Sequence, residues 1–132
     1  MVKFIEMDEK VKFNDQIQEK AIDGQVILIN KFNVTPDKID QFVKAWGQDA
    51  ANFKKTPGFI SAQLHKGIGG SNVFINYAIW ESLDHYKEAF NKVISGPESQ
   101  SIILQYDDSL VISPHLFKKV DVPGICTGSS IN

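Results

Sequence analysis

The sequence predicts an α+β fold in which the elements follow one another as β-α-β-β-α-β. Two observations predict this order. Twice, a segment in which apolar residues alternate with period two leads into a segment with helical spacing. Between these halves, a glycine-rich loop joins two further alternating segments, as in a β-hairpin.

The first core strand is predicted over residues 25–34, where side chains alternate between two faces. One face carries Val26, Leu28, Asn30 and Phe32. The run Thr35-Pro36-Asp37 then signals a helix start, because it offers an N-cap, a first-turn proline and a first-turn acid. Apolar residues at three- and four-residue steps predict a helix over residues 36–54, which Pro57-Gly58 ends.

A second strand is predicted over residues 59–65, with Ile60, Ala62 and Leu64 on one face and Phe59 on the other. Three glycines within residues 67–72 indicate the hairpin loop to a third strand over residues 73–80.

Ser82 is placed to cap a second helix, which Ser95-Gly96-Pro97 ends. Residues 101–106 are predicted as a short helix, and residues 110–122 are predicted to hold the last strand. The chain then divides into three parts. Residues 1–24 form an N-terminal extension with an edge strand, residues 25–122 form the folded domain, and residues 123–132 form a flexible tail.

The element order is that of the ferredoxin-like fold, in which two βαβ halves share a sheet. Two helices cover only one face of a four-stranded sheet, yet both faces of the first and third strands are apolar. The sequence therefore predicts that the second face meets another sheet, most economically that of a second copy of the chain.

Composition excludes several classes of function. The formal net charge of -2 and the scattered lysines give no general attraction for nucleic acid or anionic lipid. No apolar run is long enough to span a membrane and no signal peptide is evident, so cytoplasmic residence is expected. The single cysteine, Cys126, excludes an internal disulfide framework, and the histidines have no paired spacing that suggests a metal site.

The candidate chemistry lies on the third strand. Asn76 and Trp80 share a face there with Phe74 and Ala78. An unpaired amide in such an apolar wall costs about 1–3 kcal/mol, so Asn76 requires either a structural partner or a ligand. Asn30 has the same kind of position in the first strand. For both asparagines the competing interpretation is a structural amide that bonds to backbone.

Tyr86 and His65 complete the candidate set. Tyr86 lies six residues after Trp80, on the first turn of the following helix, from where its hydroxyl reaches either the same cavity or its rim. His65 ends the second strand, where an exposed hairpin histidine is as compatible with the sequence as an acid or base near neutral pH. Trp46 and Phe53 are assigned to the core.

Three runs within residues 24–93 form a characteristic set: GQVILINKFNVTPDKIDQF, TPGFISAQLHK and FINYAIWES. Their most specific parts are Pro57-Gly58-Phe59 and the Asn76-x-x-x-Trp80 pair. This set resembles the antibiotic biosynthesis monooxygenase family. The resemblance implies a homodimer whose two sheets form an α/β barrel, with one pocket in each protomer.

Characterised members of that family oxidise anthrone-type polycyclic phenols to quinones with dioxygen and without metal or flavin. The resemblance implies catalytic roles for Asn30, Asn76, Trp80 and Tyr86, and for His65 if the hairpin differs by one residue. An arginine that some members use has no counterpart, because the chain contains no arginine.

The sequence and the resemblance together lead us to expect a cofactor-independent monooxygenase that acts on an electron-rich aromatic, with dioxygen as co-substrate. Phe32, Phe74 and Ala78 are expected to hold a flat substrate against Trp80. The amides of Asn30 and Asn76 are expected to stabilise its anion, and Tyr86 or His65 to move the proton.

Two alternatives stay open. One is a haem-binding or haem-degrading relative, for which Asn30 matches but the required helix tryptophan and the haem-ligating histidine have no counterpart. The other is a non-catalytic protein, for small-molecule binding or stress response, in which both amides are satisfied and the interior is filled.

Overall fold

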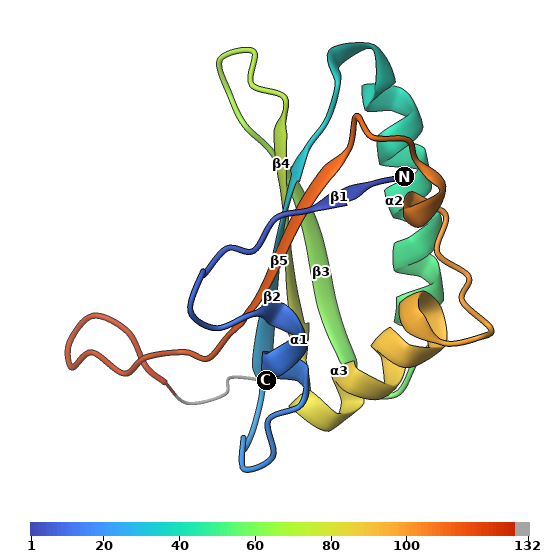
Figure 1. Ribbon diagram of the computed structural model, residues 1–132. Coiled ribbons are helices and arrows are strands. Elements are labelled where there is room, and N and C mark those ends of the chain that lie inside the picture. The colour runs from blue at the N-terminus through green and yellow to red at the C-terminus, as the bar shows by residue number, and fades with distance from the viewer. Residues whose placement is uncertain (129–132) are drawn as a thin grey trace.

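A five-stranded sheet with helices against one face forms the body of the protein in the computed structural model, which describes residues 1–128 (Figure 1). The elements are β1 (Lys3–Phe4), α1 (Phe13–Ile17), β2 (Val26–Asn33), η1 (Pro36–Lys38), α2 (Ile39–Lys54), β3 (Phe59–Lys66), β4 (Val73–Trp80), α3 (Leu83–Phe90), η2 (Asn91–Ser95), η3 (Ile103–Gln105) and β5 (Val111–Phe117). None of the helices in this part of the chain has the length and apolar stretch that crossing a bilayer requires.

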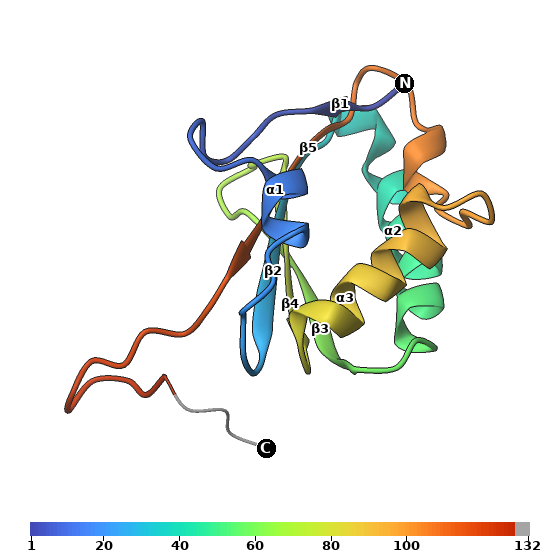
Figure 2. The ribbon, with the colours of Figure 1, turned by 60° about the horizontal axis from the view of Figure 1, so that its bottom comes forward.

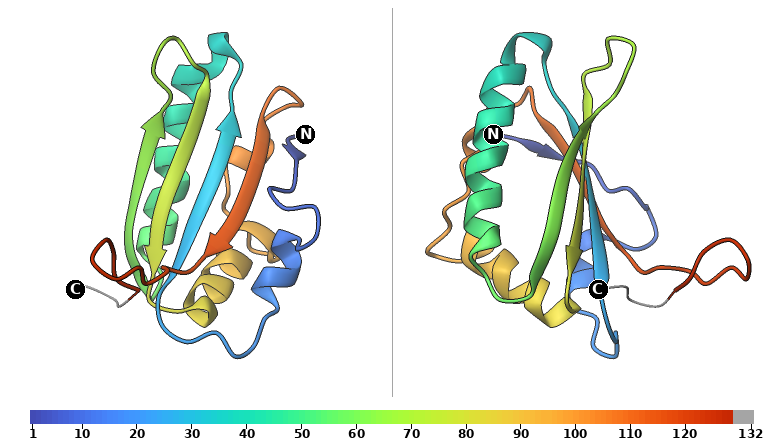
Figure 3. Two further views of the ribbon diagram at one scale, coloured as in Figure 1. Left: turned by 90° about the vertical axis from the view of Figure 1, so that its left-hand side faces the viewer. Right: turned by 180° about the vertical axis from the view of Figure 1, so that it is seen from behind.

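The strands lie in the order β1-β5-β2-β4-β3, as the left panel of Figure 3 shows. β2 pairs antiparallel with β4 and β5, β3 pairs antiparallel with β4, and β1 runs parallel to β5. The succession from β2 to β5 is the predicted β-α-β-β-α-β order, so the ferredoxin-like fold is confirmed. The edge strand expected in the extension is the two-residue β1.

The two helix starts differ from each other. Ser82 caps α3 as predicted, since its Oγ accepts a hydrogen bond from the backbone N–H of His85 at 3.1 Å. Thr35 has extended backbone before η1 but makes no side-chain cap bond. Its hydroxyl instead donates to the carbonyl of Ser109 at 3.5 Å, which ties this end of α2 to the loop before β5.

Phe59 lies on the inner face of β3, which corrects the alternation expected from the sequence. The register with β4 shifts between Phe59 and Ser61, because a β-bulge inserts an extra residue there. Phe59 therefore pairs with Trp80, and the two rings meet edge to face with centroids 5.4 Å apart. Ile60, which was expected on the inner face, is 45% exposed.

Gly58 allows the tight return from α2 into β3. Its φ of 85° is a left-handed conformation that side chains rarely adopt. A Cβ at this position would also lie 2.3 Å from the Cβ of His85, so glycine is the residue that fits against α3. The turn thereby sets Phe59 beside Trp80.

The outer face of the sheet carries apolar side chains that the single chain leaves partly uncovered. Ile75 and Tyr77 on β4 are 39% and 37% exposed, and Phe117 at the end of β5 is also exposed. Residues 118–128 project from this side, opposite α2 and α3 (Figures 1 and 3). They contain a turn closed by a bridge between Val122 and Cys126. The rest of the predicted tail, residues 129–132, lies outside the described residues.

The N-terminal extension wraps the β5 edge of the sheet (Figures 2 and 3). α1 is attached there by Gln16, whose Nε2 donates to the carbonyl of Leu116 while its Oε1 accepts from the N–H of Leu116, both at 2.9 Å. Phe13 and Ile17 of α1 are buried in the same apolar cluster as Trp80. The extension is therefore part of the folded body.

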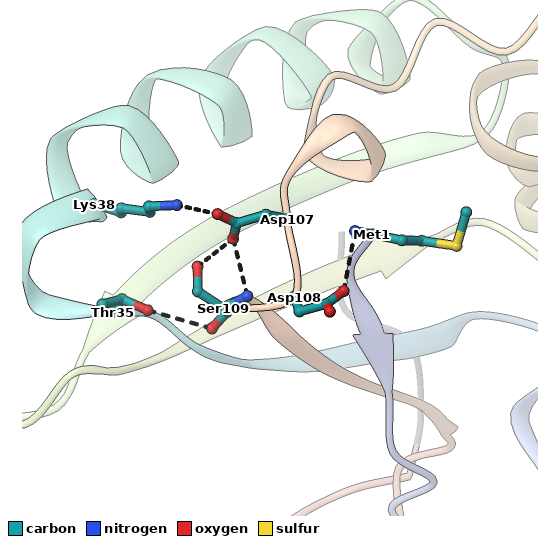
Figure 4. A network of polar contacts seen from close by, with 6 residues as sticks. All are labelled: Met1, Thr35, Lys38, Asp107, Asp108 and Ser109. Atoms are coloured by element: carbon teal, nitrogen blue, oxygen red, sulfur yellow. Dashed lines mark hydrogen bonds and ion pairs between the residues drawn. The ribbon is translucent and has the colours of Figure 1, made fainter.

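A polar network holds the loop before β5 against the start of α2 (Figure 4). Lys38 forms an ion pair with Asp107, and Ser109 donates to Asp107 Oδ1 from its N–H at 2.9 Å and its hydroxyl at 2.6 Å. The N-terminal ammonium of Met1 pairs with Asp108 at 3.1 Å. The hydrogen bonds from Lys38 and Ser109 hold the pKa of Asp107 well below its usual value.

We predict that Asp107→Asn lowers stability at neutral pH and that this loss fades in acid. The pKa of Asp107 is lower in the folded chain, so its contribution is fully present above the ordinary aspartate pKa of about 3.9 and is lost progressively as pH falls from there towards the lowered pKa of the folded chain. Urea unfolding of both proteins between pH 7 and pH 2 measures the difference. Asp37→Asn, which removes an exposed carboxylate of η1 beside Lys38, is the control. A loss that does not vary with pH would contradict the prediction.

Candidate active site

A cavity of about 360 Å³ lies between the inner face of the sheet and the helices. Its walls come from β2, β3, β4, β5, α2, α3, η2, η3 and the N-terminal extension, and most of the lining side chains are apolar. This volume lies within the range of small-molecule sites. The filled interior expected for a non-catalytic protein is not what the structure shows.

Asn30 and Asn76 stand directly opposite each other on β2 and β4, and both line the cavity. Their Oδ1 atoms are buried and have no hydrogen-bond partner among the described residues. Both flanking residues in the same row, Leu64 on β3 and Pro114 on β5, have apolar side chains. The hydrogen bonds that a structural role for these asparagines would require are therefore absent. Each unpartnered amide oxygen costs about 1–3 kcal/mol of stability and is available to a ligand.

Trp80 and Tyr86 form an aromatic wall beside the amides. Both are 2% exposed, both line the cavity, and their ring centroids lie 5.4 Å apart. Phe53 and Phe59 contact Trp80 edge to face and fix its orientation. Burial raises the pKa of the Tyr86 phenol, so the hydroxyl stays protonated at neutral pH and acts as a hydrogen-bond donor.

The predicted substrate-binding residues divide into two groups. Phe32 and Ala78 line the cavity, as expected. Phe74 does not lie on its wall. Its ring packs on Phe42 with centroids 5.0 Å apart, within a second apolar cluster. Trp46 and Phe53, assigned to the core from the sequence, are wall residues.

His65 is not brought to this site. It pairs with Ile75 across β3 and β4, a register position on the outer face, and its Nδ1 lies 3.3 Å from the carbonyl of Ile75. His85 is bonded to Ser82, and His115 contacts Gln16. In the part of the chain that the structure describes, no histidine lines the cavity, and no cluster of metal-ligating side chains is present.

Asp49 is a wall residue that the sequence reasoning missed. This carboxylate is 6% exposed and accepts three hydrogen bonds, from the Ser101 hydroxyl and the Ile102 N–H at 2.7 Å and from the Ile103 N–H at 3.2 Å. It therefore fastens the segment before η3 to α2 as one side of the cavity. The signal was present, since Asp49 falls on the apolar stripe of the helix between Trp46 and Phe53.

Comparisons with known proteins bear on the family and the fold of the chain. Residues 25–93 match the family model described as antibiotic biosynthesis monooxygenase. A candidate monooxygenase from Shewanella loihica PV-4 is 29% identical over 74% of this chain and 96% of its own, with a TM-score of 0.61. SnoaB from Streptomyces nogalater, described as a cofactor-independent oxygenase, is 20% identical over 77% of this chain and 99% of its own, with a TM-score of 0.60. No curated protein sequence matches the chain.

Two kinds of polar residue in one cavity should respond differently to truncation. We predict that Asn30→Ala and Asn76→Ala change the free energy of unfolding by less than about 1 kcal/mol, because neither amide oxygen has a bond to lose. Asp49→Ala, which orphans three donors, should cost about 3 kcal/mol. Urea denaturation followed by circular dichroism measures all three. Asparagine variants as unstable as Asp49→Ala would show that the amides are structural.

Proposed function

The chain belongs to the antibiotic biosynthesis monooxygenase family, and from this premise we propose that it oxidises an electron-rich polycyclic phenol or anthrone with dioxygen, without a cofactor. The observation that carries the proposal is the pair of unpartnered carboxamides, Asn30 and Asn76, in an apolar cavity beside Trp80. The description of SnoaB as a cofactor-independent oxygenase supports it.

The reaction needs no external reductant because the substrate supplies the electrons. An anthrone loses a methylene proton to water to give an anion, and this anion reduces dioxygen. One oxygen atom then becomes the new carbonyl of the anthraquinone, and the other leaves as water with the two methylene hydrogens. The protein has to bind the flat substrate, favour its anion and exclude bulk water.

The chain's own residues match these tasks. The unpartnered Oδ1 atoms of Asn30 and Asn76 accept from a hydroxyl of the phenolic substrate. Their amide N–H groups donate to the enolate oxygen, and a preorganised donor of this kind contributes about 3–4 kcal/mol to the transition state. Trp80 stacks on the substrate. Tyr86, protonated at neutral pH, donates a hydrogen bond to an oxygen of the substrate or of the reduced dioxygen. His65 has no part in this proposal, because it lies on the outer face of the sheet.

No specific observation favours the two alternatives. A haem-degrading relative needs an imidazole at the iron, and no histidine lines the cavity within residues 1–128. A non-catalytic relative with satisfied amides would not leave both Oδ1 atoms unpartnered beside an open space.

The proposal includes a homodimer formed through the outer face of the sheet, as the resemblance implied. We expect sedimentation velocity at micromolar concentration to give the mass of two chains. Ile75→Lys should give monomers, because it places a charge among the exposed apolar side chains of β4. Ile68→Lys, on the 95% exposed hairpin loop, is the control. A monomeric parent chain would contradict the dimer.

We predict that Asn76→Ala lowers the turnover number on 1,8-dihydroxyanthrone about 100-fold, the usual effect of removing one oxyanion donor. Stopped-flow absorbance of anthraquinone formation, corrected for autoxidation without protein, measures the rate. Gln48→Ala, an exposed carboxamide on α2, should leave it unchanged. An unchanged turnover number in Asn76→Ala removes this residue from the mechanism, and a parent chain no faster than autoxidation counts against the oxygenase activity.

A further inference from the structure

The open side of the cavity is formed by the N-terminal extension. Among the described residues that line the cavity, the four classed as exposed all come from residues 4–14: Phe4, Ile5, Glu6 and Asn14. The lining residues from Leu28 onward are buried or half-buried. The extension precedes the region that matches the family model, which begins at residue 25.

Pro114 explains why the extension leaves the sheet at this point. In the parallel pair of β1 with β5, the N–H of Lys3 donates to the carbonyl of Leu110 and that of Ile5 to the carbonyl of Ile112. The next bond of such a ladder runs from the N–H of residue 114 to the carbonyl of Ile5. Proline has no N–H. The ladder therefore stops after Ile5, and a gap opens between β1 and the point where Gln16 meets Leu116.

Glu6 stands at this gap. Its Oε1 accepts a hydrogen bond of 2.8 Å from the backbone N–H of Phe13, so the carboxylate bridges the end of β1 and the start of α1. Phe4 and Ile5 beside it are 59% and 56% exposed, which is unusual for two adjacent large apolar residues in an ordered segment. Together they make an apolar rim with one charged group.

The charged side chains that line the cavity, among the described residues, are all acidic. Two carboxylates, Glu6 and Asp49, are among the described residues that line the cavity, and no lysine is. Asp49 accepts hydrogen bonds from three donors, whereas Glu6, at the exposed rim, accepts one from the N–H of Phe13. An anionic ligand that enters past Glu6 therefore meets repulsion without a compensating cation.

We propose that the extension is the entrance of the cavity and that Glu6 selects neutral polycyclic aromatics over anionic ones of the same size. Phe4 and Ile5 contact the rings as they enter. The inference deepens the proposed function, on which it rests for the aromatic nature of the ligand, and it restricts the substrate to phenols that enter uncharged.

Two dyes with one skeleton test the selection by charge: N-phenyl-1-naphthylamine is neutral, and 1-anilinonaphthalene-8-sulfonate carries a sulfonate. Titrations followed by dye fluorescence, with energy transfer from Trp46 and Trp80 in the cavity wall, should show the parent chain binding the neutral dye more tightly. Glu6→Gln keeps an oxygen for the N–H of Phe13 and should tighten sulfonate binding about fivefold without changing the neutral dye. Glu9→Gln, exposed and away from this cavity, should change neither.

A second variant tests the rim itself. Phe4→Ala combined with Ile5→Ala should weaken binding of the neutral dye about tenfold by removing apolar contact. Val11→Ala, which is also exposed on the extension but does not line this cavity, should not. Because Phe4 and Ile5 are exposed, both proteins should keep the parent circular dichroism spectrum.

The proposal is overturned if the parent chain does not bind the neutral dye, or if Glu6→Gln and Glu9→Gln have equal affinities for the sulfonate dye. Dye binding needs no turnover. A chain that shows the predicted dye selectivity but oxidises no phenol would refute the oxygenase activity and still support the entrance.

Discussion

The register between β2 and β4 is the constraint on which the candidate site depends. It sets Asn30 opposite Asn76 and Leu28 opposite Ala78, so one face of two central strands supplies both amides and the apolar floor around them. Side chains alternate along a strand, so a slip of one residue would turn every one of these groups to the outer face. The burial of the neighbouring apolar side chains fixes the register. The two amides are therefore positioned by the packing of these neighbours and not by hydrogen bonds of their own.

Polar groups of two kinds share this interior. Asp49 has its donors and fastens a wall, whereas Asn30 and Asn76 have unpartnered oxygens that face the open space. A chain selected only for stability would replace such amides by apolar residues, since an unbonded buried oxygen is costly. We propose that their presence at paired positions marks the side of the cavity where a ligand supplies the missing bonds.

The structural features that depend on the local periodicity of apolar residues could be predicted from the sequence. Alternation along a strand was enough to place Asn76 and Trp80 on one face and to predict the core topology. It failed for Phe59, because a bulge is decided by pairing with another strand. His65 lies beyond the bulge, and regular alternation with Ala62 and Leu64 places it on the outer face. The position of Glu6 at the cavity could not be predicted, since no local pattern in residues 1–24 indicates that they fold back onto the β5 edge.

The way the extension covers β5 has a further consequence. A strand edge with consecutive free N–H and C=O groups can template a strand from another molecule. Along this edge, the carbonyl of Ile112 accepts from the N–H of Ile5, and Pro114 has no N–H to donate. Both the N–H and the carbonyl of Leu116 are hydrogen-bonded to the side chain of Gln16. A foreign strand would find no two adjacent free positions there, so this border of the sheet is protected against the edge-to-edge growth that leads to fibres.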